Sequence, residues 1–224
     1  MHLADLTSAD LTTPLLLAIP LGATEQHGPH LPLGTDTTIA VELSHRLAAA
    51  RPDIVVAPAI PYGSSGEHAG FPGTLSIGRD ALELLIIELV RSADEFAGVI
   101  LINGHGGNIE PLRAAQQRLT AEGRALLLWS PTGPAEDTHA GHTETSVMLT
   151  LAPGRVATDR AEPGNTRPLQ ELMPQLRTGG VRAVSPNGVL GDPTTATTAH
   201  GARIVARWAS ALITAVERRF PGTR

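Results

Sequence analysis

Short apolar runs alternate along this chain with longer segments of helical spacing, and this alternation restricts the fold more than any other feature. Four compact apolar runs end at or beside Pro, Asn or Ser: Leu15–Ile19, Ile54–Ala57, Val99–Ile102 and Ala125–Trp129. Such runs are typical of buried strands in a parallel sheet. Between them, helical spacing extends over Thr37–Ala50, Asp80–Phe96 and Glu110–Glu122. The pattern predicts an α/β fold: a three-layer α/β/α sandwich with a mostly parallel central sheet.

The remaining segments complete this prediction. Apolar residues between Ile204 and Val216 repeat at helical intervals and predict a last amphipathic helix. Residues 152–198 are rich in Pro, Gly and Thr, so we expect long functional loops there with one short helix at Leu169–Leu176. Asp80 is a suitable N-cap for the helix that it begins. A length of 224 residues suits one domain spanning residues 1–224.

Two residue types are missing, and their absence excludes several kinds of chemistry. The chain has no cysteine, and all 17 of its Lys and Arg residues are arginine. Disulfides, thiolate metal sites, a cysteine nucleophile, a Schiff-base lysine and a P-loop lysine are therefore excluded. Nine histidines and 22 acidic residues remain as the main stock for catalysis or for binding a cofactor.

Charge and hydropathy predict the cellular compartment of the chain and the classes of partner that it binds. The net charge is −5 and the arginines are scattered, so we expect no nucleic-acid partner. The first residues lack the features of a signal peptide. The longest apolar run is far shorter than the roughly 20 residues that a membrane span needs. We therefore expect a cytoplasmic protein with no membrane partner.

The loop after the first expected strand is the first candidate site. It places Glu25, His27 and Asp36 within a Gly- and Pro-rich segment. Carboxylate and imidazole ligands together suit zinc, manganese or iron(II). Alternate residues of extended backbone point the same way, which would bring Glu25 and His27 together. The alternative is a polar surface loop in which Asp36 is only a helix N-cap.

The segment Asn103–Asn108, with the sequence NGHGGN, follows the third expected strand. Ligands bind beyond the carboxyl ends of strands in open α/β sheets, so His105 is well placed for a site. A dinucleotide-binding loop is a weak alternative, because Ile109 stands where the third glycine of that fingerprint would be. A tight turn with a hydrogen-bonded histidine is the other alternative.

Two further segments carry histidine beside glutamate. The segment His139–Ser146 holds His139, His142 and Glu144 at the start of an apolar helix that we expect over Val147–Leu151. A metal or acid–base role competes there with a capping role for Glu144. The turn-rich segment 63–74 holds Glu67 and His68, which could bind substrate, orient metal ligands or lie in an exposed loop. The other histidines without such a context, His2, His45 and His200, are expected to be surface or structural residues.

These motifs, in this order, resemble the signature of the creatininase family of binuclear metal amidohydrolases. The similarity covers about Leu15 to Leu151 and includes the segment E-x-HGPHLP with Asp36, the NGHGGN turn and the HAG-x-x-ETS segment. The resemblance implies two divalent metal ions. Glu25, Asp36 and His105 would hold one, while His27, a bridging Asp36 and a later glutamate would hold the other. Creatininase has a glutamate where this chain has Gly107, so we assign the missing ligand to Glu144.

A second set of residues narrows the resemblance. The HAGHTETS segment and the tail Ser185–Thr197 are similar to the mycofactocin-associated branch of the family, which extends the likeness to nearly the full chain. This implies a metal-dependent peptidase that releases a C-terminal Val–Tyr dipeptide from a modified precursor peptide. The resemblance also implies a homo-oligomer. Zinc, iron(II) and manganese would all suit the ligands.

Hydrolysis by an activated water also needs a proton donor for the leaving amine. We expect this general acid to be His139, with His142 second, because imidazole titrates near neutral pH. Two alternatives to the peptidase remain. One is a small-molecule amidohydrolase acting on a cyclic amide or a formamide, and the other is a nucleotide-binding or scaffold protein that binds no metal tightly.

Overall fold

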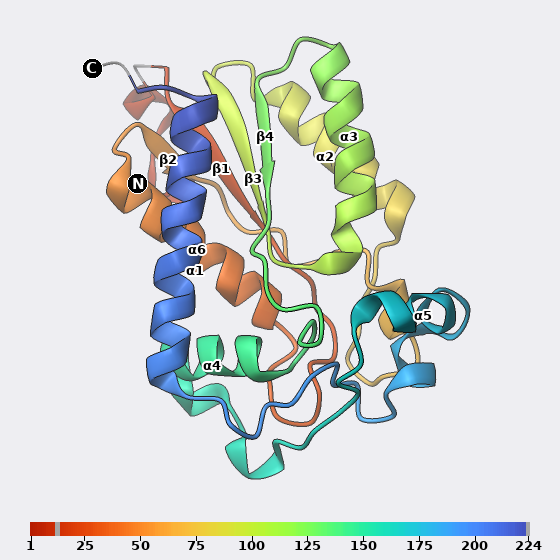
Figure 1. Cartoon of the computed structure of the whole chain (residues 1–224). Coiled ribbons are helices and arrows are strands. Elements are labelled where there is room, and N and C mark those ends of the chain that lie inside the picture. Colours follow the sequence, from red (N-terminus) through yellow and green to blue (C-terminus); the bar gives the residue numbers. More distant parts are fainter. Residues whose placement is uncertain (12–13, 223–224) are drawn as a thin grey trace.

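The computed structural model describes residues 1–11 and 14–222, and it has the predicted three layers. A parallel sheet of four strands, in the order β2-β1-β3-β4, forms the middle layer. The strands are β1 (Leu16–Leu21), β2 (Ile54–Val56), β3 (Gly98–Asn103) and β4 (Leu126–Trp129). The helices are α1 (Thr35–Ala50), α2 (Arg79–Ser92), α3 (Ile109–Ala121), α4 (His142–Leu151), α5 (Leu169–Val184) and α6 (Thr198–Arg219). Figure 1 shows α2 and α3 on one side of the sheet and α1 and α6 on the other.

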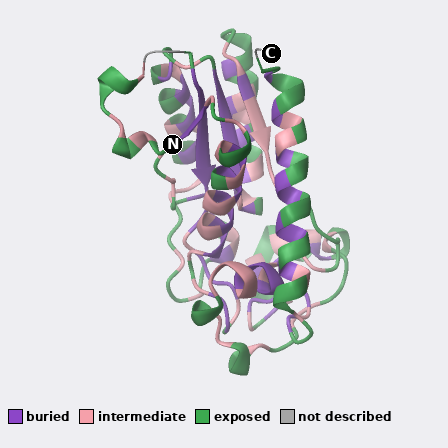
Figure 2. Ribbon diagram, turned by 90° about the vertical axis from the view of Figure 1, so that its left-hand side faces the viewer, coloured by how far each residue is buried: buried purple, intermediate pink, exposed green. Residues whose placement is uncertain are grey.

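Alternation along the strands divides the core into two clusters. In β1, Leu16 and Ala18 pack with side chains of α1, α4 and α6, whereas Leu17 and Ile19 pack with side chains of α2 and α3. Successive strand residues point to opposite faces, so a strand covered on both faces must be apolar throughout. All six residues of β1 and of β3 are buried, as the purple strands in Figure 2 show.

Parallel strands place all their carboxyl ends at one edge of the sheet. Leu16 of β1 pairs with Ile54 of β2 and with Gly98 of β3, so these strands run in step toward that edge. The loops after β1 and β3, together with α4 and α5, gather at that end (Figure 1). The predicted functional segments are therefore brought together there.

Within the described residues, no helix has the length and apolar character needed to cross a membrane.

Several predicted boundaries were wrong. The first strand runs two residues further than expected, to Leu21, because Pro20 is tolerated within it, and α2 ends at Ser92 rather than at Phe96. Gly78 occupies the N-cap position of α2 and no side chain caps it, so Asp80 does not have the capping role. The helix α5 extends to Val184 across a kink at Gly180, whose φ of 67° suits glycine.

Two boundary differences matter for the site. Asp36 is not a loop residue or an N-cap: it is the second residue of α1, is buried, and follows Gly34 at the N-cap position. The helix α4 begins at His142, five residues before the expected Val147. Glu144 therefore projects from the first turn of a helix. The sequence pattern alone predicted both carboxylates to lie outside regular structure.

Candidate metal centre

Five predicted ligands converge at the carboxyl edge of the sheet from four segments of the chain. They come from the loop after β1, the first turn of α1, the turn after β3 and the first turn of α4, and they are Glu25, His27, Asp36, His105 and Glu144. The first four have exposed fractions of 4% or less, and the Glu144 side chain is 18% exposed. Such burial of ionisable side chains requires charge compensation within the site.

The five side chains form two groups that share Asp36. Glu25, Asp36 and His105 are here named the first triad, and His27, Asp36 and Glu144 the second triad. Within each triad the potential ligand atoms lie within 4.8 Å of one another. Asp36 offers a different oxygen to each: Oδ2 lies 3.3 Å from His105 Nδ1, and Oδ1 lies 3.0 Å from His27 Nε2. This is the arrangement of a bridging carboxylate between two cation sites.

Unpartnered oxygens indicate that a metal fits this site. Both carboxylate oxygens of Glu25 and Oδ2 of Asp36 are buried and accept no hydrogen bond from the described residues. Leaving a buried carboxylate oxygen without a partner is costly, and a divalent cation would satisfy it. The ligands are only carboxylate oxygens and imidazole nitrogens, which suits zinc, manganese or iron(II).

The pKa values show how strongly the carboxylates attract positive charge. Burial opposes protonation of His27, but the nearby carboxylates, Asp36 above all, raise its pKa to about 10. Burial likewise opposes protonation of His105, yet Glu25 and Asp36 raise its pKa well above the usual value. Burial raises the pKa of Glu144 to about 7. A bound cation would replace the two imidazolium charges, because metal ligation requires neutral imidazole.

Backbone carbonyls orient both ligand imidazoles. His27 Nδ1 donates to the carbonyl of Glu25 at 3.1 Å, which leaves Nε2 facing Asp36. His105 Nε2 donates to the carbonyl of Ser64 at 3.1 Å, which leaves Nδ1 facing Glu25 and Asp36. Such hydrogen bonds fix the ring orientation and the tautomer of a metal ligand.

The asparagines of the NGHGGN turn hold His105 in place, a role that sequence reasoning missed. The Asn103 amide donates to the His105 carbonyl at 2.7 Å and its oxygen accepts from the His105 amide at 3.2 Å. Asn108 donates to Asn103 at 3.1 Å and accepts from the amide of Ser64 at 2.9 Å. The available signal was a pair of asparagines at a strand end, where buried polar side chains must find partners.

His139 lies within the cluster. Its ring centroid is 4.4 Å from those of His27 and His68, and its Nδ1 is 3.8 Å from Glu25 Oε1. Nε2 donates to the carbonyl of Gln26 at 2.8 Å, which leaves Nδ1 as the free acceptor. Burial, followed by the charges of His27 and His68, holds the pKa of His139 well below its usual value. This favours the neutral ring, in which Nδ1 carries the free lone pair.

His68 is buried against Glu25, and Gln26 supports it. His68 Nε2 lies 3.2 Å from Glu25 Oε1, and its Nδ1 lies 2.8 Å from the Gln26 amide nitrogen. The same amide donates to the carbonyl of Gly188, at 3.1 Å, in the distinctive tail segment. Gln26 was not selected from the sequence, because a single amide between two candidate ligands gives no signal of its own.

The structure does not bring His142 to this cluster. Its ring lies 3.0 Å from Thr195 Oγ1 and 2.5 Å from His200 Nδ1. His200, expected to be a surface or structural residue, pairs with it, and His2 stacks edge-on against His45 with centroids 4.7 Å apart.

The turn between His139 and His142 positions Glu144, a predicted metal ligand. Ala140 has a φ of 53°, which is unusual for a residue with a side chain. Its amide donates to Glu144 Oε2 at 2.6 Å. This contact holds the glutamate toward the second triad.

A cleft of about 1200 Å³ opens beside the cluster. His68, His105 and His139 line its floor, and Glu67 lies on its wall. Glu67, from the short 3-10 helix Gly66–His68, is one-third exposed and its Oε1 lies 3.4 Å from His105 Nε2. A Cβ on Gly107 would collide with Glu67 Oε1, Ser64 and His105, so no side chain fits at position 107.

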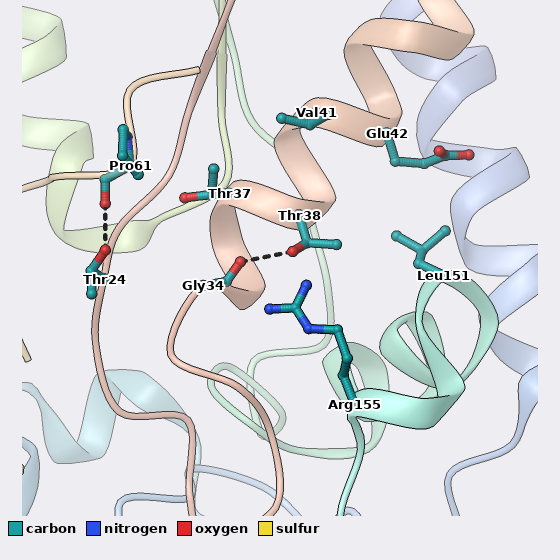
Figure 3. Close-up of a pocket in the computed structure, with 9 residues that line it drawn as sticks. All are labelled: Thr24, Gly34, Thr37, Thr38, Val41, Glu42, Pro61, Leu151 and Arg155. Atoms are coloured by element: carbon teal, nitrogen blue, oxygen red, sulfur yellow. Dashed lines mark hydrogen bonds between the residues drawn. The ribbon is translucent and has the colours of Figure 1, made fainter. Parts of the chain in front are cut away.

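A second, smaller cavity of about 460 Å³ lies against α1 and contains none of these ligands (Figure 3). The hydroxyl groups of Thr24 and Thr38 face it, but both donate to carbonyls, of Pro61 at 2.8 Å and of Gly34 at 2.9 Å. Its charged lining residues are Glu42 and Arg155. The cleft beside the histidines is therefore the better candidate for an active site.

Comparisons with known proteins identify the family. The family model described as "Creatininase: Creatinine amidohydrolase" matches residues 1–216. A protein of Mycobacterium ulcerans named mycofactocin precursor peptide peptidase is 52% identical over 228 residues, which cover 96% of this chain and 90% of that protein. A protein of the same name from Mycolicibacterium smegmatis is 53% identical over 213 residues, which cover 92% and 86%.

More distant relatives agree. The creatinine amidohydrolase of Pseudomonas putida is 28% identical over 241 residues, covering 93% of this chain and 91% of that protein. A solved structure named "Creatininase Mn" is 25% identical, has a TM-score of 0.82 and covers 99% of both chains. Another solved creatininase, described as being of Zn-Zn type, is 25% identical, with a TM-score of 0.81 and coverage of 99% and 98%. This chain belongs to the creatininase family.

Proposed function

We propose that this protein is a metal-dependent peptidase that releases the C-terminal Val–Tyr dipeptide from the modified mycofactocin precursor peptide. The observation that carries this proposal is the pair of triads joined by Asp36 beside a cleft of about 1200 Å³. Two relatives at 52% and 53% identity carry the name of this peptidase, which supports the choice of substrate. The cleft has more room than a single small ring requires, which favours the peptide over a creatinine-like amide.

The triads would hold two divalent metal ions, with Asp36 as the bridging ligand. Such ions supply Lewis-acid polarisation of the scissile carbonyl and activation of a water at neutral pH. The residues fit zinc, manganese or iron(II), and the names of two solved creatininases include zinc and manganese. The first triad would hold one ion through Glu25 and His105, and the second would hold the other through His27 and Glu144.

The proton transfers are assigned to His139. Its Nδ1 faces the cluster while Nε2 is fixed by the Gln26 carbonyl. Nδ1 takes the proton from the attacking water and then donates it to the nitrogen of the leaving dipeptide. Gln26 and His68 keep the ring in this orientation, and His68 together with Glu67 contacts the substrate in the cleft that both residues line. His142, the other predicted acid, contacts Thr195 and His200 instead.

The test is an incubation of metal-loaded protein with the modified precursor peptide, followed by mass spectrometry of the products. We expect a peptide shortened by two residues and free Val–Tyr. Asp36→Ala should give no product, whereas Asp80→Ala, which removes an acid of α2 outside the site, should cleave normally. Opening of a small cyclic amide or a formamide with no peptide cleavage would identify a small-molecule amidohydrolase instead.

Three expectations about the whole protein stand as part of the proposal. We propose that residues 1–224 form a single creatininase-like domain, that copies of the chain assemble into a homo-oligomer, and that the enzyme acts in the cytoplasm. Limited proteolysis would test the first, since a stable fragment shorter than the family match would contradict it. Sedimentation velocity and cell fractionation would test the other two.

A further inference from the structure

The cleft beside the metal centre lies between two helices with different side chains. From α3, Ile109, Glu110 and Arg113 line the cleft. From α5, Met173, Leu176 and Arg177 line it. In Figure 1, α3 lies beside the sheet, and α5 lies beyond the carboxyl ends of the strands on the same side of the molecule as α3. The lining of the cleft therefore combines apolar side chains, charged side chains and the three histidines of its floor.

The charges of the cleft do not cancel. Glu67 lies 3.4 Å from His105 Nε2, and Glu110 pairs with Arg79 at 2.9 Å, so both acids of the lining have partners. Arg113 and Arg177 are exposed and form no ion pair or hydrogen bond with any other residue among 1–11 and 14–222. Two uncompensated guanidinium groups thus face the cleft of a chain whose net charge is −5.

We propose that Arg113 and Arg177 bind the C-terminal carboxylate of the peptide substrate. This inference rests on the proposed peptidase function and adds how the enzyme selects the bond that it cleaves. A guanidinium group matches a carboxylate through two parallel hydrogen bonds, which makes arginine the preferred residue for this recognition. Both arginines line the same cleft without an ion-pair partner among the described residues, and the peptide carboxylate is an anion of complementary charge.

The size of the cleft agrees with a dipeptide between the arginines and the metal centre. A sphere of the cleft volume is about 13 Å across, while two extended residues span at most about 7 Å. Anchoring the carboxylate at the arginines would leave room for the second peptide bond from the C-terminus beside the histidines that line the same cleft. Met173 and Leu176 offer apolar contacts to the two side chains of the dipeptide.

Binding of the dipeptide itself tests the inference without requiring catalysis. Val–Tyr and its C-terminal amide are titrated by calorimetry into metal-loaded protein, as wild type, Arg113→Ala, Arg177→Ala and Arg118→Ala. Arg118 lies on the same helix as Arg113 but pairs with Glu122 and does not line the cleft, so it is the matched control. Thermal unfolding of each variant shows whether it is folded.

We expect the wild type to bind the acid about tenfold or more tightly than the amide, as charged hydrogen bonds imply. Each cleft variant should lose about tenfold in affinity for the acid and less than about twofold for the amide. Arg118→Ala should behave as the wild type. Equal affinity of the wild type for both ligands, or an equal loss of both in the variants, would overturn the inference.

A cleavage assay separates this inference from the proposed function. Precursor peptides ending in a free acid or an amide are incubated with the wild type. If neither is cleaved but the dipeptide acid is still preferred in binding, the peptidase assignment fails and the carboxylate site stands. If both are cleaved at the same rate, the peptidase assignment stands and the carboxylate site is refuted.

Discussion

The two triads share Asp36, yet the fold holds their other members in different ways. In the first triad, Glu25 and His105 follow neighbouring parallel strands, and both are almost fully buried. In the second, His27 follows β1 but Glu144 comes from α4, and its side chain is 18% exposed. A site built on strand ends is fixed by the sheet itself. A site completed by a helix also depends on every contact that positions that helix.

Replacing Asp36, which both triads share, should have the largest effect on the site. Asp36→Ala removes the oxygens that face His27 and His105, so we expect both metal ions to be lost. Peptidase activity should fall by roughly a thousandfold or more, as when a catalytic unit is removed. The fold should persist, because one buried charge is removed and α1 keeps its apolar contacts. Elemental analysis and activity of the same sample would check this, and full activity with two ions per chain would show that Asp36 is not the bridge.

Replacing one glutamate in each triad should distinguish them. Glu25→Gln should reduce metal binding at the first triad, and Glu144→Gln at the second, each by at least the roughly 10–100-fold seen when supporting residues are changed. Metal content after dialysis against a weak chelator should fall from two ions per chain to about one in either variant. Loss of both ions from Glu144→Gln would mean that the first triad cannot bind metal alone.

The contrast between the triads also explains what sequence could predict. The four apolar runs are long enough to identify strands, and the rule that parallel strands end together placed Glu25, His27 and His105 correctly at one edge. The residue pattern also grouped Asp36 with Glu25 and His27, whereas Glu144 was assigned as a ligand only through the resemblance to a family. Asp36 was expected in a loop or as an N-cap, and Glu144 before a helix that began at Val147, but both lie in the first turn of a helix.

Residues close in sequence were the hardest to assign. His139 and His142 are three positions apart and were the first and second candidates for the general acid, but only His139 faces Glu25. Ala140 adopts a positive φ between them and α4 starts at His142, so their side chains point to different regions. A backbone conformation that is unfavourable for alanine is stabilised by surrounding contacts, which a single sequence does not reveal.

Thr145→Val should weaken one contact that positions α4. Thr145 Oγ1 lies 2.8 Å from His30 Nε2, both residues are buried, and His30 Nδ1 has no hydrogen-bond partner among the described residues. Valine keeps the shape but leaves the imidazole without this partner, so we expect a loss of about 1–3 kcal/mol in the free energy of unfolding. Denaturant unfolding would measure it, with Thr145→Ser, which keeps the hydroxyl group that contacts His30, as the control. An unchanged stability would mean that the hydrogen bond contributes nothing to the position of α4.

The smallest expected effect concerns the start of α4. Its N-cap residue, Gly141, has no side chain that could accept hydrogen bonds from the first backbone amides of the helix. Asp137 Oδ2 accepts one of these bonds instead, from the Thr143 amide at 2.8 Å. Asp137→Asn keeps an oxygen at this place but removes the negative charge that favours a helix start, which is worth about 0.3–1 kcal/mol. A shift of roughly 1–4 °C in the midpoint of thermal unfolding should follow for a chain of this size.

The same variant tests whether the two triads respond independently. Since Glu144 lies in the first turn of α4, a loosened helix start should weaken metal binding at the second triad while the first keeps its affinity. Metal titration of Asp137→Asn, beside Asp159→Asn in an exposed segment as the control, would compare the two affinities. Equal weakening of metal binding at both triads would show that Asp36 transmits the change from one to the other. The two triads would then behave as one unit and not as two sites of different rigidity.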